Sequence, residues 1–474
     1  MDKQNRDNLD SKIERFFPDV CVHKGIAASV GLSGRVIPAF VLDWLVSRYR
    51  DKNGGVDGDG IRNFIARYLP DKKQKESLMY ELATGNILKI LDAYSVKVHP
   101  TKGDLQLRIP SLDITGRVVE NIVDENPLLL LGNVWGSGTL KWLPQKGKTD
   151  RFEVVMTAFK PMQTASIDLN YFISQRENFS FNEWIEFLVR CMGYNENKYS
   201  TKQKITLLTR LIPLVEPRVN IIELAPKGTG KSYIFSQLSR HAWLISGGVV
   251  TRAQLFYDMS RQQTGIISRY DAIVLDEIQT IRLKDEEEIV GAFKGYLESG
   301  EFRVMGFHGS SDAGFVLLGN IPIEYGQPRD ANFFNELPSW LNGQGATALL
   351  DRFHGLIHGW ELPRIESSSI CNSFALRADY FGEVLHGLRN SQEQMAFVKD
   401  HTESSGDLRD TRAVQRVACG FLKLLFPDIK TVSINEFNEF CLQPAIKLRS
   451  NIRHQMAIMD SEFSPDISEI TLRY

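Results

Sequence analysis

The chain has 474 residues, more than one ordinary core accommodates, so two or three domains are expected. Hydrophobic residues make up 43% and charged residues 24%, as in soluble globular proteins, and no apolar run approaches the length of about 20 residues that a membrane helix needs. The 56 Lys and Arg residues nearly cancel the 58 Asp and Glu residues, so net charge neither favours nor excludes nucleic acid as a partner. The polar start MDKQNRDNLDSKIERFF excludes a secretory signal.

The five cysteines are scattered and form no CxxC pair, and the nine histidines show no HExxH spacing. This use of cysteine is typical of the reducing cytoplasm, and neither residue type predicts a zinc site. The sequence therefore predicts a cytoplasmic protein, without contact to a membrane, whose only metal is one bound together with a nucleotide.

Residues 1–93 are predicted to form a helical N-terminal domain. The stretches VIPAFVLDWLVSRYRDK and GIRNFIARYL carry apolar residues at helical spacing, and another helix begins after Pro70. Lys72 and Lys73 lie in this charged segment. A solvated helix start and a contact with a phosphate backbone both explain them.

Residues 94–165 are predicted to form a small β domain, an OB-like barrel or a sandwich. Short runs such as YSVKVHP, DLQLRIP and RFEVVMTAF have strand composition and are separated by Gly, Pro and Asp. Barrels of the OB type bind single strands through aromatic and basic side chains. Burial of the tryptophans in a small core is an equal alternative. The candidates for such contacts are Trp135, Lys141, Trp142, Lys146 and Lys148.

Residues 166–363 are predicted to form an α/β core around the loop ELAPKGTGKS, residues 223–232. The loop matches the phosphate-binding pattern GxxxxGK[ST], except that Ala225 replaces the first glycine. A β-branched run precedes it and a helical pattern follows it, which is the context that the pattern requires. A glycine-rich turn without a ligand is the alternative.

Such a loop holds phosphates with inward N–H groups, neutralises them with a lysine and reaches Mg²⁺ with a hydroxyl. The expected cofactors are therefore ATP and Mg²⁺, with Ser232 as a metal ligand. The candidate nucleotide-binding residues are Pro226, Lys227, Gly228, Thr229, Gly230, Lys231 and Ser232.

Polar residues end two further apolar strands and follow a third apolar segment. YDAIVLDEIQT ends in an acid pair, in which Asp276 is expected to hold Mg²⁺ and Glu277 to polarise the attacking water. GFVLLGNI ends at Asn320, expected beside the γ-phosphate, with a simple turn cap as the alternative. ALLDRFHGLIHGWELP carries Arg352, a candidate to reach the γ-phosphate of a neighbouring subunit.

Residues 364–474 are predicted to form a helical lid and C-terminal helices. The helix DTRAVQRVACGFL offers Arg412 and, one turn later, Arg416. One of them is expected to reach back to the bound nucleotide. For Arg416 a plain surface position is the preferred interpretation.

The stretch YLESGEFRVMGFHGSSDAGF, between the acid pair and Asn320, predicts a hairpin that faces a central channel. Arg303 and His308 are candidate phosphate contacts, and Lys294 is a weaker one. A salt bridge with Glu301 is an equal alternative for Arg303. Contacts of this kind carry no sequence information and weaken with salt.

The order of loop, acid pair, asparagine, arginine and helical lid resembles the AAA+ ATPases. LLDRF followed by a lid is similar to the arginine-finger region of MCM-type helicases and Lon-related motors. The chain from about residue 16, including FFPDVCVHKG and PKGTGKSYIFSQLS, resembles the BrxL family of Lon-like proteins in bacterial BREX phage-defence systems. The resemblance implies the following roles: Walker A for Lys231 and Ser232, Walker B for Asp276 and Glu277, sensor 1 for Asn320, the arginine finger for Arg352, and sensor 2 for Arg412.

The resemblance also implies a homo-oligomeric ring, a hexamer or a stacked pair of rings, that encircles double-stranded DNA without sequence preference as a motor or clamp. Other BREX proteins are further candidate partners. Many family members continue into a Lon-type protease domain; since this chain ends at Tyr474, no peptidase activity is expected from it. The alternative function is a protein-remodelling motor, for which Phe302 and Phe307 are candidate channel aromatics. A non-enzymatic scaffold is disfavoured by Glu277 and Arg352.

Overall fold

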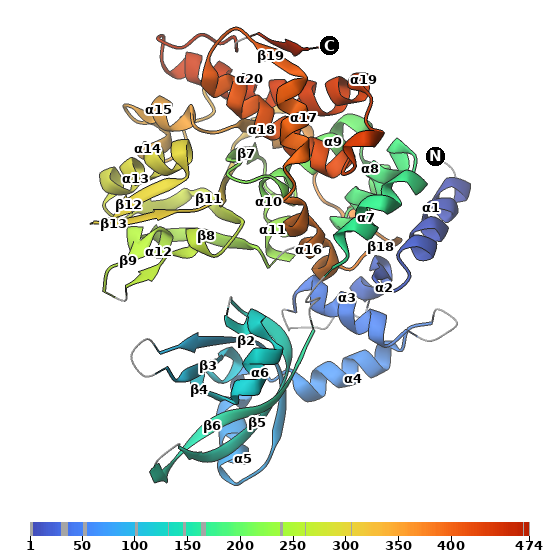
Figure 1. The fold of residues 1–474 in the computed structure, drawn as a ribbon, viewed down its shortest axis with the longest axis vertical. Coiled ribbons are helices and arrows are strands. Elements are labelled where there is room, and N and C mark those ends of the chain that lie inside the picture. The colour runs from blue at the N-terminus through green and yellow to red at the C-terminus, as the bar shows by residue number, and fades with distance from the viewer. Residues whose placement is uncertain are drawn as a thin grey trace. The chain divides into compact units, whose positions relative to one another are not determined.

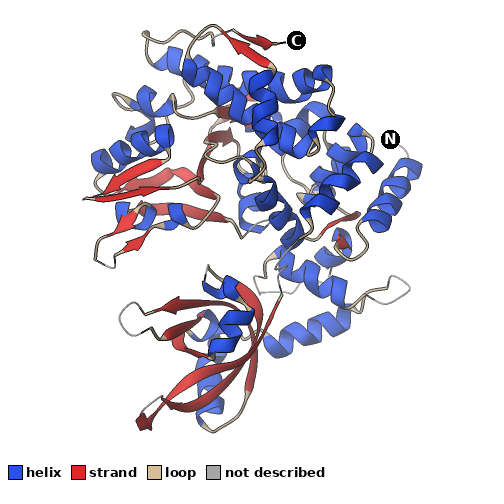
Figure 2. Cartoon of the chain, viewed as in Figure 1, coloured by secondary structure: helices blue, strands red, loops and turns tan. Residues whose placement is uncertain are grey.

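A computed structural model of the chain describes residues 3–29, 37–50, 55–99, 103–130, 132–145, 148–162, 167–237, 240–260, 262–304, 306–467 and 469–473. The chain divides into two compact units, one formed by Met1–Phe16 with Asp168–Tyr474 and the other by Phe17–Ile167 (Figure 1). Helices and strands alternate in the larger unit, and strands dominate half of the smaller one (Figure 2). The fold is therefore mixed α/β, as expected. Within the described ranges, no helix has the length and apolar character needed to cross a bilayer.

The smaller unit contains a closed barrel of five strands in the order β2-β3-β4-β6-β5, which confirms the predicted β-barrel. Among the barrel pairings that the structure describes, that of β4 with β6 is parallel and the others are antiparallel. Alternating side chains such as Tyr94, Leu107 and Met156 fill its interior. Gly138 has no room for a side chain, because an added Cβ would lie 2.7 Å from the Tyr94 hydroxyl. The strands are β2 (Leu88–Val98), β3 (Leu105–Ile109), β4 (Ile114–Val118), β5 (Val134–Gln145) and β6 (Lys148–Pro161).

Helices of the smaller unit pack around a second core that includes Val41 and Ile65. Apolar residues at helical spacing build this core, and the Asp57 carboxylate caps the N-terminus of α4. The helices of this second core are α2 (Lys24–Ser29), α3 (Ala39–Arg48) and α4 (Gly58–Tyr68). The helices α5 (Lys75–Ala83), α6 (Glu120–Glu125) and η3 (Pro127–Leu130) pack against the barrel core instead, and η1 (Lys72–Gln74) precedes α5.

The larger unit is built on a parallel sheet of five strands in the order β17-β7-β14-β11-β8. Parallel strands are covered on both faces, which explains their continuous apolar runs. Phe235 packs against Val274 and Val316 on one face, whereas Ile273, Phe315 and other alternate residues face the main core. The strands are β7 (Ile221–Ala225), β8 (Ala242–Val250), β11 (Ala272–Leu283), β14 (Gly314–Asn320) and β17 (Gly355–His358).

Helices before and after the sheet complete the larger unit. In Figure 1, α18 and α20 run side by side near the C-terminus, in orange and red. The helices that precede the sheet are α1 (Lys3–Phe16), α7 (Leu169–Gln175), α8 (Phe181–Cys191), α9 (Thr201–Thr209) and α10 (Ile212–Val215). Those that follow β7 are α11 (Lys231–Gln237), α12 (Arg252–Leu255), α13 (Glu286–Ser299), α14 (Ser339–Asn342), α15 (Ala346–Leu350), α16 (Ala378–Leu388), α17 (Glu393–Asp400), α18 (Leu408–Leu425), α19 (Ile434–Phe437) and α20 (Gln443–Met459). The domain boundaries expected at residues 93, 165 and 363 stay predictions.

Candidate nucleotide site

The glycine-rich loop lies at the carboxyl edge of the sheet, between the last residue of β7 and the first residue of α11. Ala225 is the last residue of β7 and is fully buried. It needs no glycine backbone, and its methyl group faces Gly359, where an added Cβ would come within 2.6 Å of it. The loop itself uses glycine where the backbone is left-handed, at Gly228 (φ 84°) and Gly230 (φ 73°). The replacement of the first motif glycine is therefore accommodated by packing.

Three consecutive carbonyls of the loop are held from outside. Ile365 N donates to the Gly228 carbonyl at 2.8 Å, Arg210 Nη2 to the Thr229 carbonyl at 3.3 Å, and the Tyr194 hydroxyl to the Gly230 carbonyl at 3.0 Å. In a trans peptide the N–H points away from the preceding carbonyl. The amides of residues 229–231 are therefore turned to the opposite side, as an anion-binding loop requires. The donor set fits a polyphosphate.

A buried ion pair supports this loop. Arg210 binds Glu223 on β7 in a bidentate manner, at 2.6 and 2.9 Å, and both side chains are at most 1% exposed. Burial opposes the charge of Arg210, but Glu223 more than offsets it and raises the arginine's pKa. Burial raises the pKa of Tyr194, which therefore remains a hydroxyl donor. Sequence reasoning missed Arg210 and Tyr194, because neither lies in a motif.

The side chains of Lys231 and Asn320 meet at the carboxyl edge, with Lys231 Nζ 2.6 Å from Asn320 Oδ1. Their positions follow from the register, since Asn320 on β14 pairs with Ala225 on β7. Burial lowers the pKa of Lys231, whereas the carboxylates of Glu223, Asp276 and Glu277 act in the opposite direction. An ammonium held this way is suited to take a phosphate oxygen in place of the amide.

The acid pair lies on β11, next to β14 in the same sheet. Asp276 is 7% exposed and its Oδ1 accepts a hydrogen bond from Glu277 N at 2.9 Å. Glu277 has a left-handed backbone (φ 52°) at the point where the pairing of β11 with β8 shifts, and its side chain is exposed. Strained backbone of this kind persists where the surrounding structure holds it, often at functional sites. Gln279 Nε2 donates to the Asn320 carbonyl, which ties the strand of the acid pair to the end of β14.

The remaining loop residues lie beside this group. Ser232 follows Lys231 in α11 and is half-buried. Thr229 is buried and its hydroxyl donates to the Pro226 carbonyl at 3.3 Å, whereas Lys227 is exposed. Ser232 and Asp276 are the residues that could hold Mg²⁺.

Arg352 and Arg412 lie at the opposite edge of the sheet from Lys231. Arg352 precedes β17 at its amino end, where Asn220 Nδ2 donates to its carbonyl at 3.5 Å. A five-residue strand such as β7 is about 16 Å long, which separates the two edges. Arg412 therefore does not reach the loop of its own chain. It lines the cleft of Arg352, which has a volume of about 240 Å³.

This cleft at the amino edge, the arginine cleft, carries five arginines and two acids. Burial and then Arg409 lower the pKa of Arg352. Arg412 is exposed, and within the described ranges no hydrogen bond or ion pair of its side chain is found. The cleft suits an anion supplied from outside the chain. Its charged residues are Arg218, Glu298, Asp351, Arg352, Arg409, Arg412 and Arg416.

The surface position expected for Arg416 is wrong. The side chain is half-buried, and its Nη1 donates to the Pro217 carbonyl at 2.8 Å. Burial and then Arg218 lower its pKa. Arg416 therefore supports the segment that leads into β7, a long-range contact that helical spacing does not reveal.

The predicted hairpin is present as β12 (Glu301–Val304) and β13 (Phe307–Ser310). Arg303 and His308 are exposed cross-strand partners, so both project from one face. Phe302 is 2% exposed in the main core, and Phe307 stacks on Tyr257 of the neighbouring strand β9 (Tyr257–Asp258) at 3.8 Å. Figure 1 shows β9, β12 and β13 together at the left edge of the larger unit.

The other residues predicted to contact nucleic acid lie on α13, in η1 and in the barrel, and their positions give less support to such a contact. Lys294 is half-buried on α13, and its Nζ donates to the Gly345 carbonyl at 3.3 Å. Lys73 is exposed in η1, while the side chain of Lys72 lies outside the described residues. Trp135 and Trp142 are partly buried against the two cores of the smaller unit, which supports the structural alternative for them. Lys141 is half-buried; Lys146 and the side chain of Lys148 lie outside the described residues.

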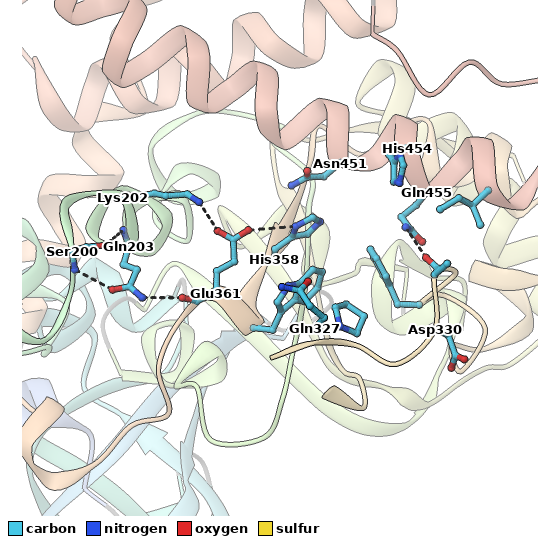
Figure 3. Close-up of a pocket in the computed structure, with 15 residues that line it drawn as sticks. Ser200, Lys202, Gln203, Gln327, Asp330, His358, Glu361, Asn451, His454 and Gln455 are labelled. Carbon is cyan, nitrogen blue, oxygen red and sulfur yellow. Dashed lines mark hydrogen bonds and ion pairs between the residues drawn. The ribbon is translucent and has the colours of Figure 1, made fainter. Parts of the chain in front are cut away.

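A second cavity, with a volume of about 710 Å³, contains none of the predicted site residues. Figure 3 shows Glu361 between Lys202 and His358, and its carboxylate lies 3.0 Å from Lys202 Nζ and 3.7 Å from His358 Nδ1. His358 stacks on Trp360 with ring centroids 4.1 Å apart, and burial lowers the His358 pKa to about 4. The cavity adjoins the carboxyl end of β17 but not the phosphate loop.

A histidine cluster lies at the amino edge. The ligand atoms of His241, Asp271 and His386 lie within 4.8 Å of one another, which is close enough for a metal ion. However, the two rings are parallel (3°) with centroids 3.9 Å apart, so their in-plane lone pairs do not converge. Arg389 approaches Asp271, and Glu383, which contacts His241 at 2.9 Å, pairs with Arg240. The arrangement is better described as an ion-pair network between the sheet and α16.

Two family models match the sequence. The one described as "Lon-like protease BrxL-like, ATPase domain" matches residues 154–469, and the one described as "BREX system Lon protease-like protein BrxL N-terminal" matches residues 15–142. The chain is 30% identical over 461 residues to Lon-like protease BrxL of Escherichia coli O9:H4 (strain HS), covering 95% of this chain and 65% of the relative. It is 28% identical over 464 residues to Lon-like protease BrxL of Bacillus cereus (strain H3081.97), covering 95% and 67%. The chain thus spans about two thirds of the length of these relatives.

Proposed function

The chain belongs to the BrxL family of Lon-like ATPases, and we propose that it is an AAA+ ATP hydrolase whose ring binds or encircles DNA during bacteriophage defence. The observation that carries the proposal is the division of the catalytic groups between two edges of one sheet. Lys231, Asp276 and Asn320 lie at the carboxyl edge, and Arg352 and Arg412 at the amino edge. One chain cannot close such a site alone, but two adjacent copies can.

Each residue has a role in this site. Lys231 neutralises the phosphates within the loop, Ser232 and Asp276 would hold Mg²⁺, and Glu277 orients the attacking water. Asn320 leaves Lys231 and contacts the γ-phosphate. Arg352 of the adjacent copy stabilises the charge that develops there, and Arg412 assists it from the same cleft. ATP and Mg²⁺ supply the reacting phosphate and a Lewis acid when bound. In contrast to the expectation from sequence, Arg412 then acts on the neighbouring subunit's nucleotide.

DNA is the proposed track, held without sequence preference by Arg303 and His308 on the hairpin. Double-stranded DNA, a hexamer or stacked pair of rings, and contact with other BREX proteins remain part of the proposal. Turnover stimulated by duplex DNA, with a stimulation that weakens steeply with salt, supports it. ATP hydrolysis by the purified chain that does not respond to duplex DNA over a range of salt concentrations speaks against it.

A protein-remodelling motor is the second candidate. It is disfavoured by the two hairpin aromatics, because Phe302 is buried in the core and Phe307 is stacked on Tyr257. Neither ring is free to grip a polypeptide. Stimulation by an unfolded protein rather than by DNA would reverse this preference. Peptidase activity is not part of the proposal.

A further inference from the structure

Glu298 joins the arginine cleft to the hairpin. It lies in the last turn of α13, and its Oε2 is 3.3 Å from Arg352 Nε and 3.2 Å from Arg409 Nη2. The helix ends at Ser299, Gly300 reverses the chain (φ 80°), and the hairpin begins at Glu301. Only Ser299 and Gly300 therefore separate Glu298, which pairs with Arg352, from the strand that carries Arg303.

The backbone around Arg352 is held in place, so movement of this residue is limited to its side chain. Arg449 is fully buried and donates to the carbonyls of Asp351 and Phe353, at 2.9 and 2.7 Å, on either side of Arg352. It also pairs with the Asp351 carboxylate at 2.6 Å. The Arg352 side chain is 17% exposed, and its guanidinium is bound within its own chain by a hydrogen bond to the Ala348 carbonyl and an ion pair with Glu298.

The hairpin and the end of α13 form one packed body. Phe302 lies against Tyr296 of α13, with ring centroids 6.4 Å apart, and Ser311 N donates to the Gly300 carbonyl at 2.9 Å. Arg218 Nη1 holds the Ser299 carbonyl at 2.6 Å. A displacement of the hairpin therefore moves Glu298 with it, because packed elements shift together rather than deform.

We propose that Glu298 is a positioning residue that retains Arg352 within its own protomer until the hairpin engages an anionic polymer. This inference rests on the proposed function of Arg352. A carboxylate and the γ-phosphate compete for the same guanidinium, so the Arg352–Glu298 pair keeps turnover low in the absence of the polymer. Binding at Arg303 and His308 moves the end of α13, separates Glu298 from Arg352 and frees the finger for the adjacent subunit.

The kinetic test uses Glu298→Gln, with Glu287→Gln on the first turn of the same exposed helix face as the matched control. Without DNA, Glu298→Gln should raise kcat about threefold to fivefold, the scale of a partly exposed ion pair, leave KM for ATP unchanged and reduce the fold stimulation by duplex DNA. Arg303→Ala should lose stimulation, and the double variant Glu298→Gln/Arg303→Ala should keep the raised basal rate. A double variant no faster than Arg303→Ala alone would overturn the inference.

A second measurement does not depend on hydrolysis. Modification of Arg352 by an arginine-selective dicarbonyl, followed by peptide mass spectrometry, reports how free its guanidinium is. Glu298→Gln, or duplex DNA added to the parent, should increase modification of Arg352, and Glu287→Gln should not. Unchanged modification in Glu298→Gln refutes the retention of Arg352 even if the protein proves to be a DNA-stimulated ATPase. Increased modification in a protein that hydrolyses no ATP supports the retention and instead refutes the proposed function.

Discussion

The ammonium of Lys231 lies 2.6 Å from the amide oxygen of Asn320. The two side chains come from segments 89 residues apart in the sequence, and the parallel pairing of β7 with β14 brings them together. Around them, the phosphate loop, Asp276 and Glu277 share the same edge of the sheet. This arrangement assigns separable tasks to the lysine and to the exposed glutamate.

Removing the charge of either Lys231 or Glu277 should abolish ATP turnover, but for different reasons. Lys231→Ala should weaken nucleotide binding, because the loop loses its cation, whereas Glu277→Gln should bind ATP normally and fail to activate water. Equilibrium binding of a fluorescent ATP analogue and phosphate release separate the two effects. Glu286→Gln, outside the site, is the control for Glu277→Gln. Parental hydrolysis in both site variants would show that the site is misplaced.

Arg210 should be the most destabilising of the loop-supporting residues to remove. Arg210→Met leaves Glu223 buried without a partner and should lower the free energy of unfolding by about 3–5 kcal/mol. Adding Glu223→Gln should recover part of this loss, because the uncompensated charge is gone. Denaturant titration of the three proteins tests both statements. If Arg210→Met were as stable as the parent, the assigned role of the ion pair would be contradicted.

Ala225→Gly should restore the usual motif with little gain. Ala225 already fits the end of β7, and the space beside its methyl group is kept open by Gly359. We expect affinity for ATP within about twofold of the parent and a small loss of stability, since glycine gains freedom in the unfolded chain. Gly359→Ala places a methyl group against that of Ala225 and should lower the stability far more than Ala225→Gly does. Tenfold tighter ATP binding by Ala225→Gly would show that the alanine impairs the loop.

The stability of the larger unit should depend on pH through His386. Its hydrogen bond to Asp271 raises the His386 pKa, burial opposes the rise, and the neighbouring charges are Glu383 and Arg389. Since the pKa is higher in the folded protein, protonated His386 stabilises the fold fully below its unfolded value of about 6.5, and this contribution is lost as pH rises through the folded value.

Chemical denaturation of the parent and His386→Gln at about pH 6 and about pH 8.5 measures this linkage. The parent should exceed the variant in stability at the lower pH, and the difference should shrink at the higher pH. His308→Gln on the exposed hairpin is the control, and the groups beside His386, which are His241, Asp271 and Glu383 with its partner Arg240, are present in every protein compared. A difference that grows with pH would contradict the assignment.

Local patterns were sufficient to predict the glycine-rich turn between a strand and a helix, the strands that carry the acid pair and Asn320, the hairpin and the barrel, because each is encoded within about ten residues by turn chemistry and strand alternation. The alternation of polar and apolar residues in EFRV also indicates that Phe302 is buried and that the next residue, Arg303, is exposed on the other face of the strand. Contacts between residues that lie far apart in the sequence could not be predicted. Arg210 with Glu223, Arg416 with the Pro217 carbonyl, and Glu298 with Arg352 depend on how elements pack, and an isolated sequence does not encode these distances in any short motif.

The most direct test of a site shared between two protomers is a mixing experiment with two inactive variants. Lys231→Ala retains a usable Arg352, and Arg352→Ala retains a usable phosphate loop, so an intact site forms only where the two meet in the correct order. Random equal mixing should restore about a quarter of the parental turnover per chain in a ring with head-to-tail contacts. No recovery, although mass photometry shows that the two variants assemble together, would contradict the shared site.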